Sequence, residues 1–344
     1  MSAAISRRVG TEVTAAMAVM WIAFCLLVWI FGASPRGTAW LLVEGTWGTS
    51  YGVGQVLFKA TPLLFTGIAV DLALRAGLFN IGAEGQLAVS SLVAGAVGAR
   101  LPESVPALLG IPLVLVLAMA AGALWATVPA LLKIRFGAHE VISTIMMNRI
   151  AEGVVGMALA AGGLALTGTV RTPDVASGAR MPRLDVWFSA LRGSAVSFAA
   201  PLAVVAAVVV ALSYRRTRFG RELGLIGKNP VAMQSEGVPV GKRLAQALVL
   251  SGAITGAASL GTVLGYKGYF EEGLGMGAGF GGIAVALLGR GSAVGLVLAA
   301  LLFGTLQQGG LAVNAVVPKE LMDVLEGVVI FAVAVAEAQG KKRS

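Results

Sequence analysis

The sequence predicts an all-α, polytopic membrane protein with about ten transmembrane helices, in a single transmembrane domain over residues 1–344. The chain has 57% hydrophobic and only 12% charged residues, and its mean hydropathy of +0.86 lies far above the soluble globular range. Short polar intervals separate its long apolar runs. Its 47 glycines suit close helix packing in lipid. The net charge of +9 is therefore interpreted as a sign of membrane topology and not of a nucleic-acid partner.

Ten apolar segments account for most of the chain. The first follows two arginines and is longer than the apolar core of a signal peptide, so we expect it to be retained as a span. Lys and Arg are more frequent in the intervals that this order puts inside, which predicts cytoplasmic N- and C-termini. The basic interval 167–194 is the exception, because it is expected outside as a loop with some structure. The expected spans are 13–35, 55–74, 87–99, 107–132, 154–166, 195–214, 244–266, 283–289, 291–317 and 321–336.

The longest polar interval, residues 215–243, is strongly basic. A short basic interval between two apolar spans is typical of the cytoplasmic side of a membrane. Inside it, Asn229 and Pro230 form a helix-start signal, and Gly237 followed by Pro239 forms a stop signal. The pattern predicts a short helix parallel to the membrane. A solvated connection between two spans is the alternative.

The third and eighth segments each begin in a polar, glycine-rich stretch: LFNIGAEGQ at 78–86 and GMGAGFGGIAVALLG at 275–289. If the ten spans divide five and five, these segments occupy corresponding places with opposite direction. Matched interruptions in two halves are typical of an inverted repeat with the transport path nearby. The alternative is coincidence, because glycine is abundant throughout the chain.

Charged residues inside apolar spans are costly unless they are paired or hydrated. Asp71 and Arg75 stand four residues apart, and Arg149 and Glu152 three apart. Each pair can meet on one helical face. We expect both pairs to be self-neutralising and structural.

Glu84 differs from these pairs because its nearest polar neighbours in the sequence are Asn80 and Gln86. A carboxylate that faces lipid would cost on the order of 2.5–3.5 kcal/mol. We therefore expect Asn80, Glu84 and Gln86 to face the bundle interior, near the cytoplasmic end of a translocation path. For Glu84, a buried hydrogen bond to backbone is the equal alternative.

No catalytic, metal-binding or cofactor-binding pattern stands out. His139 is the single histidine, and Cys25 is the single cysteine, so neither a histidine metal site nor an internal disulfide is expected. The chain has no G-x-x-x-x-G-K-[ST] motif for a nucleotide triphosphate. Residues 277–282 match G-x-G-x-x-G, but no strand precedes them, which indicates a chance match.

Four segments follow one another through most of the chain: GLFNIGAEGQ (77–86), HEVISTIMMNRIA (139–151), GRELGLIGKNPVAMQSEGV (220–238) and GFGGIAVALLG (279–289). Together they resemble permease subunits of bacterial ABC importers for ribose, branched-chain amino acids and nucleosides. The resemblance is greatest to the nucleoside branch, which uses a lipoprotein of the basic membrane protein type. It implies a plasma-membrane permease that works with an ATPase of two fused nucleotide-binding domains, a second, dissimilar permease subunit and that lipoprotein.

The resemblance also assigns the ATPase-coupling loop to residues 215–243. The Glu-Ala-Ala motif of many such loops is absent, and residues 231–233 occupy its position. His139 stands where a small polar residue such as Asn is expected. The coupling contacts fall on Gly227, Asn229, Ala232, Ser235 and Gly237.

Other functions stay open from the sequence. A simple-sugar or branched-chain amino acid permease would resemble the same family, because selectivity lies largely in the separate binding protein. An ion-coupled secondary transporter would use Glu84, Asp71 or Asp323 to carry a proton or cation and would leave the basic loop without a purpose. An integral-membrane enzyme is the third alternative, and it lacks a catalytic constellation.

Overall fold

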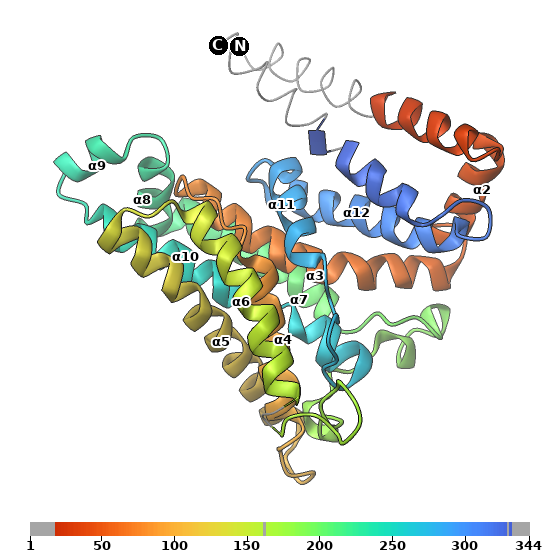
Figure 1. The fold of residues 1–344 in the computed structure, drawn as a ribbon, viewed down its shortest axis with the longest axis horizontal. Helices are drawn as coiled ribbons and strands as arrows, with labels where there is room; N and C mark the ends of the chain where they lie inside the picture. The colour runs from red at the N-terminus through yellow and green to blue at the C-terminus, as the bar shows by residue number, and fades with distance from the viewer. Residues whose placement is uncertain (1–17, 161–162, 329, 332–344) are drawn as a thin grey trace.

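The computed structural model describes residues 18–160, 163–328 and 330–331. The described residues form helices and loops (Figure 1). Their only β-type pairing is two isolated backbone bridges, which do not form a sheet. Helix Ala18–Ile30 and α2 (Pro35–Thr46) form a pair bent by 113°. Six other helical segments are long and apolar enough to span a membrane: α3 (Ser50–Arg75), α5 (Ala107–Phe136), α6 (Glu140–Ala160), α7 (Ala199–Arg216), Val240–Lys267 and α12 (Ala293–Val313).

The chain is thus a polytopic helical membrane protein, but its described residues hold six candidate spans, or seven with the bent pair, and not the expected ten. The third and eighth expected spans are the short helices α4 (Ala83–Gly98) and α11 (Ala278–Gly289). At 1.5 Å per residue they measure about 24 and 18 Å, less than a hydrocarbon core of roughly 30 Å. The expected last span and both basic termini lie partly or wholly outside the described residues.

The expected start of the fifth span is wrong. α6 begins at Glu140 and not at Val154, so the polar segment before Val154 is helical as well. Its hydroxyls are satisfied within the helix, because Ser143 and Thr144 donate to the carbonyl of Glu140 at 3.1 and 2.7 Å. Internal hydrogen bonds of this kind allow a polar stretch to continue into an apolar helix.

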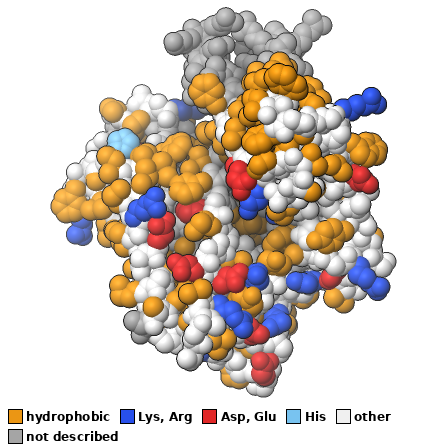
Figure 2. Space-filling model, turned by 45° about the vertical axis from the view of Figure 1, so that its right-hand side comes forward, with side chains coloured by type: hydrophobic (Ala, Val, Ile, Leu, Met, Phe, Trp, Pro, Cys, Tyr) orange, Lys and Arg blue, Asp and Glu red, His pale blue; other side chains and the backbone are white. Residues whose placement is uncertain are grey.

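α3 and the segment Val240–Lys267 form the centre of the bundle, since most of each is buried, whereas α5, α6 and α7 are mostly exposed. The exposed surface of α5 is apolar, with Leu108 and Leu124 83% and 73% exposed. Figure 2 shows hydrophobic side chains over much of one face, with charged side chains mainly in its middle and lower parts. Such a surface is unfavourable in water and suits lipid acyl chains.

The central segment Val240–Lys267 consists of α10 (Val240–Gly256) and a π-helical continuation, Leu260–Lys267. α10 packs directly on the backbone of α5. A Cβ added at Gly252 would overlap the carbonyl of Gly122, and one at Gly256 would lie 2.6 Å from the carbonyl of Ala118. Small residues four apart allow this approach, as expected from the glycine content.

α8 (Arg218–Ile226) and α9 (Pro230–Ser235) lie together at one end of the molecule, beside the start of α10 (Figure 1). We call this the loop end. Segment 163–198 lies at the opposite end, where one of its 3-10 turns contacts α5 near Gly110. Backbone hydrogen bonds hold it, including Thr172 N to Phe270 O at 2.8 Å and Met181 N to Leu264 O at 3.0 Å. The expectation that this interval has structure is confirmed.

Candidate functional site

The short helix predicted in the basic loop is present as α9, residues Pro230–Ser235. The Asn229 side chain caps it by accepting a hydrogen bond from Ala232 N at 3.0 Å. At the other end Gly237 has φ +76, and the Val238 amide donates to the Met233 carbonyl at 3.0 Å. That bond closes a Schellman motif, for which a glycine in the left-handed region is the usual residue. The start and stop signals in the sequence are confirmed.

The five residues expected to contact a partner ATPase are all exposed: Gly227, Asn229, Ala232, Ser235 and Gly237. Gly227 also has a contact within the chain. Its Cα side faces the end of α3, where an added Cβ would overlap the Arg75 carbonyl and lie 3.1 Å from Gly77 N. The loop is therefore held against the turn that leads from α3 to α4.

Glu222 fastens α8 to the start of α10. Its two carboxylate oxygens accept from Arg218 Nε and Arg243 Nε, each at 2.6 Å, and its side chain is 8% exposed. The Arg218 hydrogen bond, together with the bond and charge of Arg243, lowers the pKa of Glu222. Arg218 itself is largely exposed, so Arg243 is the better-shielded partner.

An apolar cluster beneath α8 completes this attachment. Leu223 is fully buried and packs with residues of three spans: Leu72 of α3, Ala130 of α5 and Leu248 of α10. No residue of α9 is buried. The loop thus consists of an anchored helix, α8, and a presented helix, α9. This arrangement can pass a push on α9 to the ends of three spans.

Asn80 and Gln86 lie in the interior, as expected. Asn80 Nδ2 donates to Gln86 Oε1 at 3.0 Å and to Ser251 Oγ at 2.8 Å, and Ser251 Oγ donates to the Ala69 carbonyl at 2.7 Å. Asn80 Oδ1 accepts from the Gly82 amide at 3.0 Å. Both amide side chains are fully buried, so this cluster joins the turn before α4 to α10 and α3.

Glu84 makes different contacts. Its Oε1 accepts from the Gly277 amide at 2.7 Å, and its Oε2 accepts from the amides of Gly279 and Phe280 at 2.8 and 3.3 Å. The carboxylate therefore caps the N-terminus of α11, where the helix dipole favours negative charge. Glu84 thus bonds to backbone, as the alternative expected, but these bonds are exposed or half-buried and not fully buried, and the partners are distant in sequence. A Cβ at Gly279 would overlap the backbone of Glu84, so the two glycine-rich stretches meet directly.

A cavity of about 400 Å³ lies beside this contact, between α4, α6 and segment 270–280. Three acidic residues and one basic residue line it: Glu84, Glu152, Glu272 and Arg149. Its apolar lining includes Leu87, Val155, Phe270, Leu274, Met276 and Phe280. The excess of carboxylates opposes anions, while the apolar lining suits an uncharged polar molecule with flat, weakly polar faces.

Asn148 positions α6 at this cavity and was missed by the sequence reasoning. Its Oδ1 accepts from the Gly85 amide at 2.9 Å, and its Nδ2 donates to the Ile81 carbonyl at 2.9 Å. The amide therefore satisfies backbone groups at the start of α4. The available signal was its position four residues after the buried Thr144, which places both on one face of α6.

The structure forms both predicted ion pairs, Asp71–Arg75 at 3.0 Å and Arg149–Glu152 at 3.1 Å. The second pair is exposed, with 76% of the Arg149 side chain and 52% of the Glu152 side chain accessible. Such a pair in mid-span is more than self-neutralising packing, because it needs water or another subunit beside it. Glu140 forms its ion pair with Lys133, at 2.8 Å, and not with the adjacent His139.

The chain matches the protein family described as branched-chain amino acid transport system / permease component over residues 52–334. It is 36% identical over 321 residues to the guanosine ABC transporter permease protein NupP of Bacillus subtilis, covering 90% of this chain and 88% of that protein. It is 30% identical to the nucleoside ABC transporter permease protein NupB of Lactococcus lactis, covering 90% and 86%. It is 31% identical to the glucose ABC transporter permease protein TsgB13 of Haloferax volcanii, covering 95% and 87%. No solved structure matches the chain.

Proposed function

The chain belongs to the family of branched-chain amino acid transport system permease components and is a permease subunit of an ABC importer, and we propose that its cargo is a nucleoside. The observation that carries this proposal is its similarity to a guanosine permease and a nucleoside permease over nine-tenths of its length. Permeases of this family work with an ATPase and a binding protein in a membrane.

The cavity beside Glu84 supports an uncharged cargo. Its volume of about 400 Å³ lies in the usual range for small-molecule sites, roughly 300–1,000 Å³. A nucleoside offers a flat base for contact with Phe270 or Phe280 and hydroxyls for the carboxylates. A nucleotide would bring phosphate charge against Glu84, Glu152 and Glu272, which opposes its entry.

A simple sugar is the second candidate, because the glucose permease TsgB13 is also similar over most of its length. Sugar hydroxyls would suit the same carboxylates. A branched-chain amino acid has less support, since its own carboxylate would meet three others in the cavity. An ion-coupled carrier is not favoured, because NupP, NupB and TsgB13 are ABC permeases.

A second permease subunit is proposed to close the open side of this cavity. The exposed pair Arg149–Glu152 lies in the middle of α6, where contact with lipid would be costly. Exposed apolar residues such as Ile142, Met146 and Met157 continue the same helix. A subunit that covers α6 would shield the ion pair and complete a path between the two chains. A dissimilar partner, as in the nucleoside branch, is part of this proposal.

The loop end is proposed to be the cytoplasmic side, where α9 docks on an ATPase of two fused nucleotide-binding domains. Its six residues are too few for a helix that persists alone in water, and none of them is buried. Basic residues at the C-terminus of α7 and in the first turn of α10 support this orientation. The chain would then be a multi-pass protein of the bacterial plasma membrane, with both termini inside and the binding lipoprotein on the opposite face.

The cargo proposal is tested by uptake of radiolabelled guanosine into cells that carry the complete importer and no other nucleoside transporter. Deletion of this chain should abolish uptake. A hundredfold excess of unlabelled adenosine or uridine should compete, whereas glucose, leucine and guanosine monophosphate should not. Competition by glucose with no competition by nucleosides would assign the importer to sugars.

A further inference from the structure

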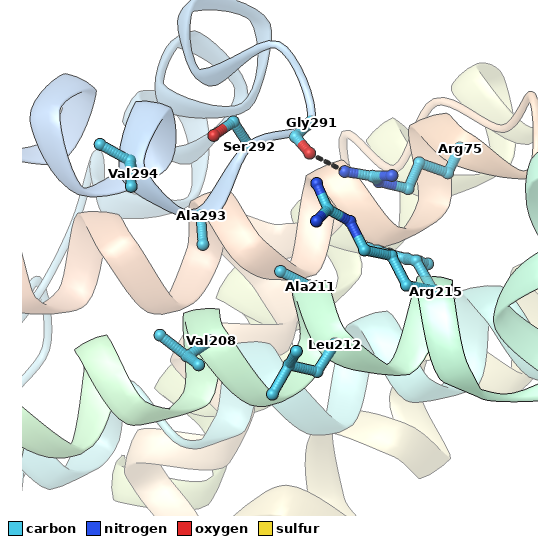
Figure 3. A pocket seen from close by; sticks show the side chains of 10 residues that line it. Arg75, Val208, Ala211, Leu212, Arg215, Gly291, Ser292, Ala293 and Val294 are labelled. Carbon is cyan, nitrogen blue, oxygen red and sulfur yellow. Dashed lines mark hydrogen bonds between the residues drawn. The ribbon is translucent and has the colours of Figure 1, made fainter.

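A second cavity, of about 310 Å³, opens at the loop end between α3, α7 and the first turn of α12 (Figure 3). It lies apart from the cavity beside Glu84 and from α9. Two arginines contribute to its lining, Arg75 from the end of α3 and Arg215 from the end of α7. No acidic residue lines it. Figure 3 shows both side chains close to Gly291, at the turn before α12.

Arg75 is held in a fixed position. Its Nε donates to Asp71 at 3.0 Å, its Nη2 donates to the Gly291 carbonyl, and its guanidinium lies 3.8 Å from the ring centre of Tyr214. A guanidinium carries five N–H donors, so these bonds leave donors for a ligand. The guanidinium of Arg215 has no hydrogen bond or ion pair to any described residue. The cavity therefore holds one oriented cation and one cation that has no partner among the described residues.

Two further groups in the lining lack partners. Tyr214 is only 9% exposed, yet its hydroxyl has no hydrogen-bond partner among the described residues. The amides of Ala293 and Val294 open α12, where the first amides of a helix have no carbonyl of their own helix to bond. The Ser292 side chain caps the helix by accepting from Gly295 N, and the two amides have no hydrogen-bond acceptor among the described residues. A buried hydroxyl, two amides and two guanidiniums thus surround one space.

The wall on the α7 side is apolar. Val208, Ala211 and Leu212 line the cavity, and the exposed residues Val205 and Val209 continue the apolar surface of α7. α7 changes from apolar residues to Arg215 and Arg216 at this level, as spans do where acyl chains give way to headgroups.

We propose that this cavity binds the phosphodiester headgroup of an anionic phospholipid, with the acyl chains along α7. Arg75, Arg215 and the α12 amides bind the phosphate oxygens, and the Tyr214 hydroxyl donates a further hydrogen bond. A free phosphate would use the same cations but would leave the apolar wall unoccupied. An acidic side chain of a partner protein would have to reach past the exposed side of α7. The lipid fits both parts of the cavity.

The test is native mass spectrometry of the full-length chain, purified with its partner subunits and titrated with phosphatidylglycerol or phosphatidylcholine. We expect one phosphatidylglycerol to bind more tightly than phosphatidylcholine. Arg215→Gln should weaken that binding roughly tenfold, as expected for loss of one charged hydrogen-bonding group. The matched control is Arg216→Gln, because Arg216 is its exposed neighbour and does not line the cavity. This control should change binding less than twofold.

A second variant separates the cavity from surface charge. Ala211→Leu enlarges a side chain of the apolar wall and so fills part of the cavity without changing its charge. It should also displace the bound phosphatidylglycerol. Equal losses for Arg215→Gln and Arg216→Gln would overturn the proposal, as would equal binding of the two lipids. Displacement of phosphatidylglycerol by millimolar inorganic phosphate would assign the site to a soluble anion. A lipid that binds only when the ATPase is removed would identify the ATPase as the occupant.

Discussion

The contact between Glu84 and α11 gives the sharpest prediction. Glu84→Gln keeps the size and polarity of the side chain but removes its charge and one acceptor oxygen. Three backbone amides now bond to the carboxylate, those of Gly277, Gly279 and Phe280. A glutamine can accept from one side only, and its own NH₂ would face the remaining amides. The variant should therefore loosen the junction of α4 and α11 without disturbing the packed spans.

The size of this effect follows from the contacts. A hydrogen bond to a charged group contributes about 1.5–3 kcal/mol, and a charge at a helix N-terminus about 0.3–1 kcal/mol. The bond to Gly277 is exposed and that to Gly279 is half-buried, so solvent screening places the loss near the lower end. We expect the unfolding free energy to fall by about 2 kcal/mol. Uptake should be lowered or altered, because the loosened junction lies beside the proposed path.

Two measurements are made on each variant. The first is unfolding of the purified protein in mixed detergent micelles, and the second is substrate uptake in membranes that carry the complete importer. Glu272→Gln is the matched control, because Glu272 lines the same cavity but its carboxylate has no hydrogen bond or ion pair to a described residue. It makes the same change of charge and should leave stability unchanged. Wild-type stability and uptake for Glu84→Gln would refute the reasoning. Equal destabilisation by both variants would refute it too, since the effect would then reflect cavity charge alone.

Three further predictions concern the loop end and the membrane topology. Ala232→Asp should leave the spans inserted but reduce co-purification of the ATPase and uptake at least about tenfold, and normal values of both would mean that α9 is only a solvated connection. In a Cys25→Ser background, an impermeant thiol reagent should label Ser189→Cys but not Ser235→Cys on intact cells; the reverse pattern would invert the topology. The lowered pKa of Glu222 means that its ion pairs stabilise the fold above the ordinary glutamate pKa of about 4.3, and that this contribution disappears as pH falls through the lowered value. The stability difference between wild type and Glu222→Gln should therefore be constant from roughly pH 6 to 8 and shrink in acid, and a difference that grows in acid would contradict the pairing.

Local signals in the sequence predicted the loop end well. The cap at Asn229, the stop at Gly237 and the pair Asp71–Arg75 depend on residues a few positions apart, and all three are present. The overall class was predicted for the same reason, because hydropathy is a local property. The proposed contact of α9 with an ATPase has no counterpart within the described chain, because no residue of α9 is buried.

Contacts between distant segments could not be read from the sequence. Glu84 lacks a partner among its neighbours, and its bonds are to amides near residue 279, which carry no side-chain signal. The predicted number of spans was wrong for a related reason. Apolar composition marks α4 and α11 as membrane segments, but both helices are shorter than a full span, and their glycine-rich starts pack against each other. The polar start of α6 was misassigned because its hydroxyls bond within the helix.

A push on α9 reaches the Glu84 junction more directly through α10 than through α3. Glu222 joins α8 to Arg243 in the first turn of α10, and further along that helix Ser251 holds Asn80 in the turn before α4. α10 also packs on the backbone of α5 through glycines, so it can shift along α5 without repacking large side chains. The links through α3 are the backbone contact of Gly227 and the apolar cluster that holds Leu223 and Leu72, and both transmit pressure better than tension. A rigid shift of α10 would thus move Asn80 and strain the bonds of Glu84 to α11 beside the cavity.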